Sequence, residues 1–205
     1  PVTDGKNVYV FFPDFGLVSF GPDGDERWRL PLGPFPTFYG LGASPILAGD
    51  TLLLSCDTRT KAFLIAVDAA SGRVRWRAER SEIRFDGWAS PILYEPEGQP
   101  AQVIALSSHR LDAYAVATGE RMWWLRGLGY LPVGSPVLGK DMLLFSIPGA
   151  DAPEGPTFEQ WLKSDSNGDG RVSAAEAPDF DEFGAVDINS DGFIDRSEWD
   201  RLRNS

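Results

Sequence analysis

The sequence predicts a mainly β fold, a partial β-propeller of about three and a half four-stranded blades, followed by a small α-helical unit. Three observations predict it. A Ser-Pro-Ile/Val-Leu segment recurs along the chain, a Gly-x-x-x-Trp element recurs with nearly the same period, and the last quarter of the chain is strongly acidic. The first two observations concern the blades and the third concerns the C-terminal unit.

The Ser-Pro-Ile/Val-Leu segment occupies residues 44–47, 90–93 and 135–138, and its prolines are 46 and 45 residues apart. The tryptophans of the second element are 48 and 47 residues apart; they are Trp28, Trp76 and Trp123. Self-similarity at such a period is typical of repeat architectures. The blades are expected at about 1–42, 43–88 and 89–134, with a fourth that begins near residue 134 and continues to residue 147.

Each repeat contains short apolar or alternating runs bounded by polar turns, which is the pattern of β-strands. The expected strands are 8–12, 17–20, 26–30, 51–55, 63–67, 73–77, 102–106, 111–116 and 121–125. Together with the Ser-Pro segments they give four strands per repeat of about 45 residues, which is typical of a propeller blade. Helical periodicity is absent from residues 1–148.

In the Gly-x-x-x-Trp element we expect the glycine to form a turn and the tryptophan to pack on the neighbouring blade. The run from Ala66 to Trp76 resembles the tryptophan-docking motif of quinoprotein-type propellers, A-x-D-x-x-x-G-x-x-x-W. The third repeat departs from it, because Ala115 stands where the motif has Asp. The resemblance covers about residues 1–148 and implies the fold. It leaves activity open, because such propellers include both dehydrogenases and non-catalytic scaffolds.

Residues 1–6 align with residues 45–50, so the chain opens one residue inside the Ser-Pro motif. Open propeller edges are templates for aggregation. We therefore expect the natural protein to have more blades. The predicted division is a blade domain at 1–150 and a C-terminal domain at 151–205, the latter being an insertion within one blade or a terminal appendage.

Charge separates these two parts. Residues 1–150 carry 16 acidic and 14 basic side chains, whereas residues 151–205 carry 14 acidic and 5 basic side chains. So acidic a segment disfavours nucleic acid and anionic lipid and favours a cation. No run of 18 apolar residues occurs, so no membrane span is predicted.

The acidic residues follow the EF-hand loop template D-x-[DN]-x-[DN]-G-x5-E at 165–176 and again at 187–198. Calcium prefers six to eight oxygen ligands, and the template supplies them at loop positions 1, 3, 5, 7, 9 and 12. In the first loop the expected ligands are Asp165, Asn167, Asp169, Arg171, Ser173 and Glu176. In the second loop they are Asp187, Asn189, Asp191, Phe193, Asp195 and Glu198. Arg171 and Phe193 would contribute backbone carbonyls. The sequence therefore predicts an EF-hand pair that binds two Ca²⁺ ions.

The flanks of the two loops also repeat. Val172 and Ile194 are expected to form a short β-bridge. Phe158 and Trp161 before the first loop match Phe180 and Phe183 before the second, at an offset of 22 residues, and should anchor a small shared core with Trp199 and Leu202. Only residues 177–186 separate the loops, so we expect one short helix at about 179–185. Such compactness favours a structural role for calcium over signalling. With four ligand carboxylates against three, the second loop should bind calcium more tightly.

The sequence offers little for catalysis. Cys56, the sole cysteine, is expected to be a small buried hydrophobe, and His109, the sole histidine, a structural residue. Of the neighbours Trp123 and Trp124, one is expected to pack between blades and the other to be half exposed. No catalytic residue is predicted, and an enzyme is the less favoured interpretation.

The leading hypothesis is a calcium-binding protein whose non-catalytic propeller is a binding or assembly platform, with a protein partner on the propeller face. One alternative is a quinoprotein dehydrogenase whose cofactor site lies in blades outside this chain. Another is an EF-hand pair that docks a second protein, as dockerins do. Calcium reaches the concentrations that weak loops need outside the cytosol. The resemblance to quinoprotein-type propellers also implies an envelope or periplasmic protein. The expected location is therefore periplasmic, in the cell envelope, or secreted.

Overall fold

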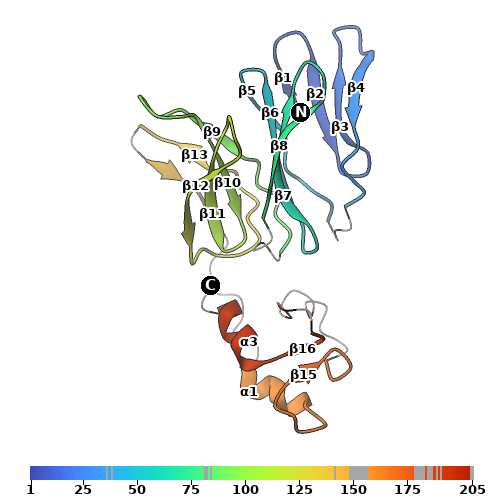
Figure 1. The fold of residues 1–205 in the computed structure, drawn as a ribbon, viewed down its shortest axis with the longest axis vertical. Helices are drawn as coiled ribbons and strands as arrows, with labels where there is room; N and C mark the ends of the chain where they lie inside the picture. Colours follow the sequence, from blue (N-terminus) through green and yellow to red (C-terminus); the bar gives the residue numbers. More distant parts are fainter. Residues whose placement is uncertain are drawn as a thin grey trace. The chain divides into compact units, whose positions relative to one another are not determined.

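The structure is a computed structural model that describes residues 1–35, 37, 39–80, 83, 85–140, 142–147, 157–177, 183, 187, 189 and 191–203, with side chains up to residue 200. The chain divides into two compact units, Pro1–Pro148 and Gly149–Ser205. The first contains the β-sheets, and the second contains short helices and a two-stranded β-bridge (Figure 1). The domain boundary predicted near residue 150 falls outside the described residues and stays a prediction.

Three antiparallel sheets of four strands form the blades, and within each sheet the strands follow chain order. Blade one contains β1 (Val2–Thr3), β2 (Val8–Phe12), β3 (Gly16–Phe20) and β4 (Glu26–Leu30). Blade two contains β5 (Ile46–Ala48), β6 (Thr51–Asp57), β7 (Ala62–Asp68) and β8 (Val74–Glu79). Blade three contains β9 (Ile92–Tyr94), β10 (Gln102–Ser107), β11 (Arg110–Ala115) and β12 (Arg121–Arg126). These strands confirm the mainly β fold and the predicted blades.

A fourth blade begins after the third. Its described strands are β13 (Val137–Leu138) and β14 (Leu143–Leu144), which pair as a separate two-stranded sheet. Leu143, Phe145 and Ile147 pack against the buried core of blade three. The half blade is therefore stacked on blade three, which accounts for the three and a half blades that the sequence predicts.

Apolar faces are buried between successive blades. Tyr9 and Leu17 of blade one pack with Leu52 and Phe63 of blade two, and all four are at most 1% exposed. Leu53 and the opposite face of blade two pack against blade three. Because successive side chains of a strand point to opposite faces, a strand buried on both faces becomes continuously apolar. This explains the unbroken apolar runs of the middle blade.

The repeated tryptophans join each blade to the next. The Trp28 indole N–H donates to the Ala69 carbonyl at 3.0 Å, and its ring lies against Gly72, where a Cβ atom would come within 2.6 Å of it. The Trp76 indole N–H donates to the Val116 carbonyl at 2.8 Å and lies equally close to Gly119. In both cases the accepting carbonyl comes three residues before the glycine, as the alignment of the repeats requires. The packing role predicted for these two tryptophans is confirmed.

The Ser-Pro segments have a role that the sequence pattern did not reveal. The backbone N–H of Ser44 donates to the Ser90 hydroxyl at 2.8 Å, and the N–H of Ser90 donates to the Ser135 hydroxyl at 3.0 Å. Each serine thus connects the innermost strand of its blade with that of the neighbouring blade. The connection continues into the half blade, which places it in the same register as its predecessors.

The C-terminal unit begins with α1 (Phe158–Trp161) and a 3-10 turn, η1 (Leu162–Ser164). The two strands β15 (Val172–Ser173) and β16 (Phe193–Ile194) pair with each other, and α3 (Arg196–Arg203) ends the described chain. The helix predicted at about 179–185 lies, except for Phe183, outside the described residues. No helix in the described parts of either unit is long and apolar enough to cross a membrane.

Candidate metal centre

The first loop follows a capped helical turn. Thr157 is the N-cap of α1, and it exchanges hydrogen bonds with Gln160: the Gln160 N–H donates to the threonine hydroxyl, and the Thr157 N–H donates to the Gln160 side-chain oxygen. This reciprocal capping satisfies N–H groups that a helix start leaves free. The helix then ends through η1, and Asp165 leaves the helical conformation with φ −64° and ψ 96°. The chain thus enters the loop at its first predicted ligand.

Hydrogen bonds from the backbone turn the ligand side chains of the first loop inward. The Asp165 carboxylate accepts from the N–H groups of Gly168 and Gly170, at 2.7 and 2.9 Å. The Asn167 side-chain oxygen accepts from the N–H of Asp169 at 2.8 Å. Gly170 has φ 79°, a left-handed conformation that glycine adopts without steric strain. The glycine predicted at loop position 6 is therefore where the turn requires one.

The second loop repeats this arrangement. The Asp187 carboxylate accepts from the N–H groups of Asp191 and Gly192, at 3.1 and 2.9 Å. The Asn189 side-chain oxygen accepts from the N–H of Asp191 at 2.8 Å, and the Asp191 carboxylate accepts from the N–H of Phe193 at 2.9 Å. Gly192 has φ 86°. In both loops, 22 residues apart, the position-1 carboxylate therefore accepts from the N–H of the position-6 glycine, and the position-3 asparagine accepts from the N–H of position 5.

The glutamates at position 12 reach back across their loops. Glu176 accepts hydrogen bonds from the backbone N–H and the hydroxyl of both Ser166 and Ser173, over 2.7–3.0 Å. Glu198, only 3% exposed, accepts from the N–H groups of Asn189 and Asp195, both at 3.1 Å. Hydrogen bonds from Ser173 and then Ser166 lower the pKa of Glu176 to about 2, since they stabilise its charged form. The glutamate is therefore an anion at neutral pH, as a calcium ligand must be.

A β-bridge and a small core couple the two loops. Val172 pairs with Ile194 in β15 and β16, as predicted, and both are fully buried. They pack with Phe158, Trp161 and Trp199, of which the two tryptophan rings lie 5.0 Å apart. The two loops thus share one β-bridge and one hydrophobic core.

Positions 7 and 9 show contacts that the template did not indicate. The Arg171 guanidinium lies 4.1 Å from the centre of the Phe193 ring, so the two residues at position 7 pack together across the bridge. Asp195, at position 9, accepts from the N–H of Glu198 at 2.9 Å, while Glu198 accepts from its N–H. Asp195 therefore caps the start of α3 as well as being a predicted ligand. The spacing Asp-x-x-Glu at 195–198 was a signal for this capping box.

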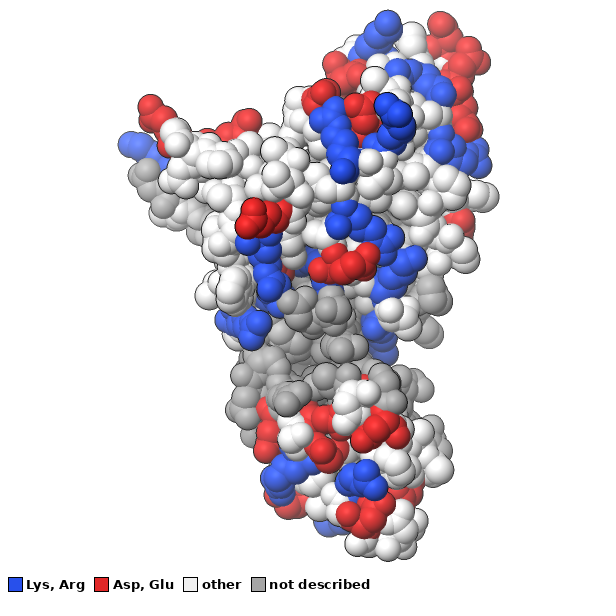
Figure 2. Space-filling view, viewed as in Figure 1, with Lys and Arg blue, Asp and Glu red and all other residues white. Residues whose placement is uncertain are grey.

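The donors gathered in these loops are all oxygens. The only histidine and the only cysteine of the chain, His109 and Cys56, lie in the blades. An all-oxygen set suits a hard cation such as calcium or magnesium better than zinc. In the view of Figure 2, Asp and Glu prevail over Lys and Arg on the described surface of the C-terminal unit, whereas the blades carry patches of both. The chemistry of the loops therefore fits the predicted ion.

The loop carboxylates are engaged with backbone donors. Across the described residues, no three His, Cys, Asp or Glu side chains converge closely enough to form an assembled metal site. The residue-by-residue ligand assignment and the number of two ions accordingly stay predictions. Ion binding would have to exchange these backbone hydrogen bonds for metal contacts.

The blades contain a buried ionic network that the sequence analysis missed. Arg80 is 1% exposed and donates to Asp57 at 2.8 Å, to the Ser107 hydroxyl at 2.5 Å and to Asp112 at 3.3 Å. Arg110 donates to the same Asp112 at 2.8 Å. The network connects blade two with blade three. Isolated charges inside strands gave no sequence signal that they would meet across a blade interface.

Cys56 and His109 make the contacts of structural residues. Cys56 is fully buried, and burial raises the pKa of its thiol. His109 has its Nδ1 atom 3.2 Å from the Leu128 carbonyl and its ring stacked on Tyr130, and burial lowers its pKa. Both therefore match what the sequence predicts for them.

The prediction for the tryptophan pair of β12 is partly wrong. Trp124 is half exposed, as expected, but Trp123 is also exposed, at 36%, and its indole N–H donates to Gln102 of its own blade at 2.8 Å. The reason is that the fourth blade contributes only β13 and β14 among its described strands. The strands that would cover Trp123 are not among them.

Comparison with known proteins agrees with both units. The EF hand family model matches residues 180–202, a span that contains the whole second loop. Among solved structures, BamB from Moraxella catarrhalis is similar to this chain with a TM-score of 0.52 and 16% identity, over 71% of this chain and 45% of that one. The N-terminal unit has a β-propeller fold. This chain spans less than half the length of BamB.

A quinohemoprotein alcohol dehydrogenase from Comamonas testosteroni is also similar, with a TM-score of 0.46 and 19% identity, over 62% of this chain and 20% of that one. No curated protein matches the sequence. At such low identities the structural similarity concerns the fold and leaves the activity open.

Proposed function

We propose that this chain binds two calcium ions through its paired loops, with the twelve predicted ligands contributing side-chain or backbone oxygens. The observation that carries the proposal is the repeated geometry: each loop turns at a left-handed glycine, directs its position-1 carboxylate to the N–H of that glycine, and is closed by its position-12 glutamate. Calcium loops use such carboxylates as side-chain and bidentate ligands.

The role of calcium in this proposal is structural. Carboxylates gathered in one turn repel one another, and a bound dication removes that repulsion. Because Val172 and Ile194 connect the loops, an ion in one loop stiffens the other. The ten residues between the loops leave little length for the helix opening on which calcium sensors depend. Calcium is therefore expected to order the unit and to expose no new surface.

Calorimetric titration of calcium into chelator-treated protein tests this proposal. We expect two binding events for the unmodified chain and none for the double variant Glu176→Gln/Glu198→Gln. A matched control is Asp200→Asn, which removes an exposed acidic side chain of α3 that is not a predicted ligand. Absence of binding at millimolar calcium, or binding that survives the double variant, would contradict the proposal.

For the blades, we propose a non-catalytic platform that binds protein, in a compartment outside the cytosol where calcium is plentiful. Support comes from the contacts of the residues that could have been catalytic, since Cys56 is buried in the core and the partly buried His109 stacks on Tyr130. Reconstitution with pyrroloquinoline quinone, followed by an alcohol–dye assay, separates the dehydrogenase alternative. Turnover that depends on the quinone would overturn the platform proposal and leave the calcium proposal intact.

A further inference from the structure

The residue after each repeated tryptophan occupies the same position on the outer strand of its blade. Because successive side chains of a strand alternate, this residue points away from the blade that follows. Blades one and two have an arginine there, paired with an apolar residue of the third strand, whereas blade three has a tryptophan there, paired with a buried carboxylate. The three pairs are Arg29 with Val18, Arg77 with Ile65, and Trp124 with Asp112.

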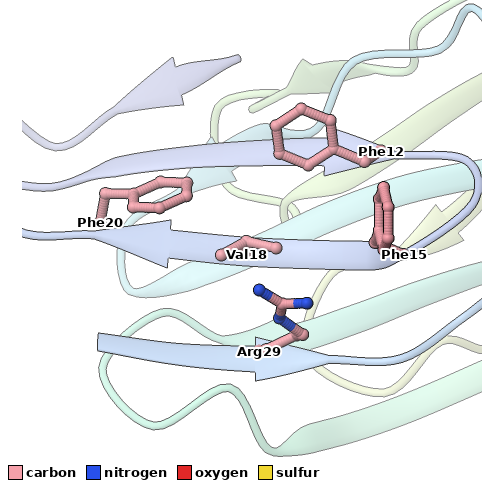
Figure 3. A pocket seen from close by; sticks show the side chains of 5 residues that line it. All are labelled: Phe12, Phe15, Val18, Phe20 and Arg29. Carbon is pink, nitrogen blue, oxygen red and sulfur yellow. The ribbon is translucent and has the colours of Figure 1, made fainter. Parts of the chain in front are cut away.

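In blades one and two, the arginine at this position is paired within its own strand. Figure 3 shows Arg29 reaching from β4 over a hollow that is otherwise lined by apolar side chains of blade one. Its guanidinium lies 2.7 Å from the Glu26 carboxylate. The Arg77 guanidinium lies 3.7 Å from the centre of the Phe63 ring and pairs with Glu79. Both outer strands therefore contain a carboxylate that neutralises the arginine.

Blade three has a buried ionic network behind Trp124. The Asp112 carboxylate is 1% exposed and accepts hydrogen bonds from Arg80 of blade two and from Arg110. Asp57 accepts from the same Arg80. Among the described residues, two buried carboxylates thus face two buried arginines, and their charges cancel. Further arginines on β12 therefore add positive charge to this face.

Two such arginines lie beside the Trp124 ring, which is 50% exposed. The guanidinium groups of Arg121 and Arg126 are 5.0 and 6.0 Å from the ring centre, within the range of cation–π contacts. Unlike β4 and β8, β12 contains no acidic residue. In the described part of the chain, Arg126 forms no ion pair with a carboxylate. This face of β12 is consequently both apolar and positively charged.

β12 is also an edge strand. It comes last in the order of its sheet, beside β11, and no strand of the described residues pairs with its other side. The structure describes the chain on both sides of β12, at 115–120 and 127–131. Charged side chains commonly protect such edges. They alternate with apolar ones in β4 and β8, but Met122 to Leu125 are four consecutive apolar residues, each at least 36% exposed.

We propose that the free edge of β12 is a docking site for an extended acidic segment of a partner protein. The segment pairs with β12 as a further strand and has the pattern acid–x–apolar–x–acid. β11 shows why this spacing fits: because of the register shift in β12, three alternate residues of β11 pair with Arg126, Trp124 and Arg121. An added strand with the same count places a carboxylate at each arginine and an apolar side chain on the indole ring. Strand addition at a sheet edge is a common mode of recognition.

Charge favours this partner over a second copy of the chain. If β12 paired with itself about its centre in the antiparallel direction, Arg121 would lie opposite Arg126 at both ends. Like charges directly opposite each other destabilise a strand pair. Carboxylates at the same places would instead form charge-assisted hydrogen bonds with the guanidinium groups. The inference rests on the platform role proposed for the blades and is independent of calcium binding.

The test uses a fluorescent, backbone-cyclised β-hairpin peptide whose exposed strand reads Thr-Glu-Thr-Val-Thr-Glu-Thr. Cyclisation preforms the strand, which would be marginal alone. We expect fluorescence anisotropy to show binding to the full chain, and amide exchange in β12 to become slower. Arg126→Gln and Trp124→Ala should each weaken binding about tenfold, through loss of a charged hydrogen bond and of an aromatic anchor. Arg29→Gln, at the position of blade one that matches Trp124, is the control and should bind normally.

Two control peptides separate strand pairing from simple attraction of charge. Replacing both glutamates by lysine should abolish binding, because lysine is repelled by the two arginines. Replacing the threonines on either side of valine by proline keeps both carboxylates but prevents strand pairing, and should also abolish binding.

Four results would each overturn the proposal: no binding at millimolar peptide, equal binding of the lysine peptide, equal binding of the proline peptide, or dimerisation of the peptide-free protein through β12. The quinone assay tests the platform role separately. Failure of the peptide to bind, without quinone-dependent turnover, would therefore remove this docking site and leave the platform proposal standing.

Discussion

Contacts in the blades span long stretches of sequence, whereas those in the calcium loops are local. The indole hydrogen bonds of Trp28 and Trp76 join residues 41 and 40 positions apart. The bonds that close the loops through Glu176 and Glu198 span 10 and 9 positions. Long-range contacts form only when whole blades are correctly placed, but a loop needs only its own dozen residues. We therefore expect the two units to respond separately to substitution.

The largest difference between the responses of the two units is expected from the substitution Glu198→Gln. This substitution removes a buried carboxylate that closes the second loop. The calcium affinity of this loop should fall by at least about 100-fold, because replacing a ligand costs more affinity than replacing a residue that only supports one. Calorimetry measures the affinity, with Asp200→Asn as the control. The unfolding transition of the blades should not move. A shift of that transition would show that the units are coupled.

The substitution Gly119→Val is expected to affect the blades and not the calcium loops. It places a side chain against the Trp76 ring and strains a residue with φ 74°. The free energy of unfolding of the blades should fall by about 3 kcal/mol, measured by urea denaturation. Gly24→Val is the matched control, because it has the same backbone strain and nothing lies within 4 Å of the added Cβ. The difference between the two variants should be roughly 2 kcal/mol. Equal losses would mean that tryptophan docking contributes nothing.

A smaller difference is expected between the two loops. The second has four ligand carboxylates and the first has three, so calcium should bind the second loop roughly tenfold more tightly. Glu176→Gln should then abolish the weaker phase of a calcium titration and leave the tighter one. Loss of the tighter phase instead would reverse the order of the loops.

The smallest effect is expected from Asp68→Asn. Arg75, and then Ser71, hold the pKa of Asp68 below its ordinary value by hydrogen bonding to the carboxylate. A depressed folded-state pKa stabilises the fold above the ordinary pKa and loses that contribution as the pH falls below it. The variant should therefore be slightly less stable at pH 7, and the difference should begin to shrink as the pH falls below about 4 and keep shrinking toward the lowered folded-state pKa. Denaturation curves between pH 7 and 2.5 measure it, with Asp23→Asn as the control.

The sequence predicted those features whose partners lie at fixed spacings. The strands, the docking of Trp28 and Trp76, the pairing of Val172 with Ile194 and the turns at Gly170 and Gly192 all follow from repeats or templates. The contact between Arg80 and Asp112 does not follow from a repeat or a template, because it depends on how two blades stack and not on a sequence spacing. The exposure of Trp123 was missed for a related reason: a motif predicts what a side chain can dock on, but not whether that partner is there.

The serine connection between blades has a direction. Ser44 donates its N–H to Ser90, and Ser90 donates its N–H to Ser135, so every bond runs from the earlier blade to the later one. Each innermost strand consequently has two different sides, one that offers an amide and one that offers a hydroxyl. Any element that continues the array after the half blade has to offer an acceptor to the N–H of Ser135. An element placed there in the opposite orientation would leave this N–H without an acceptor.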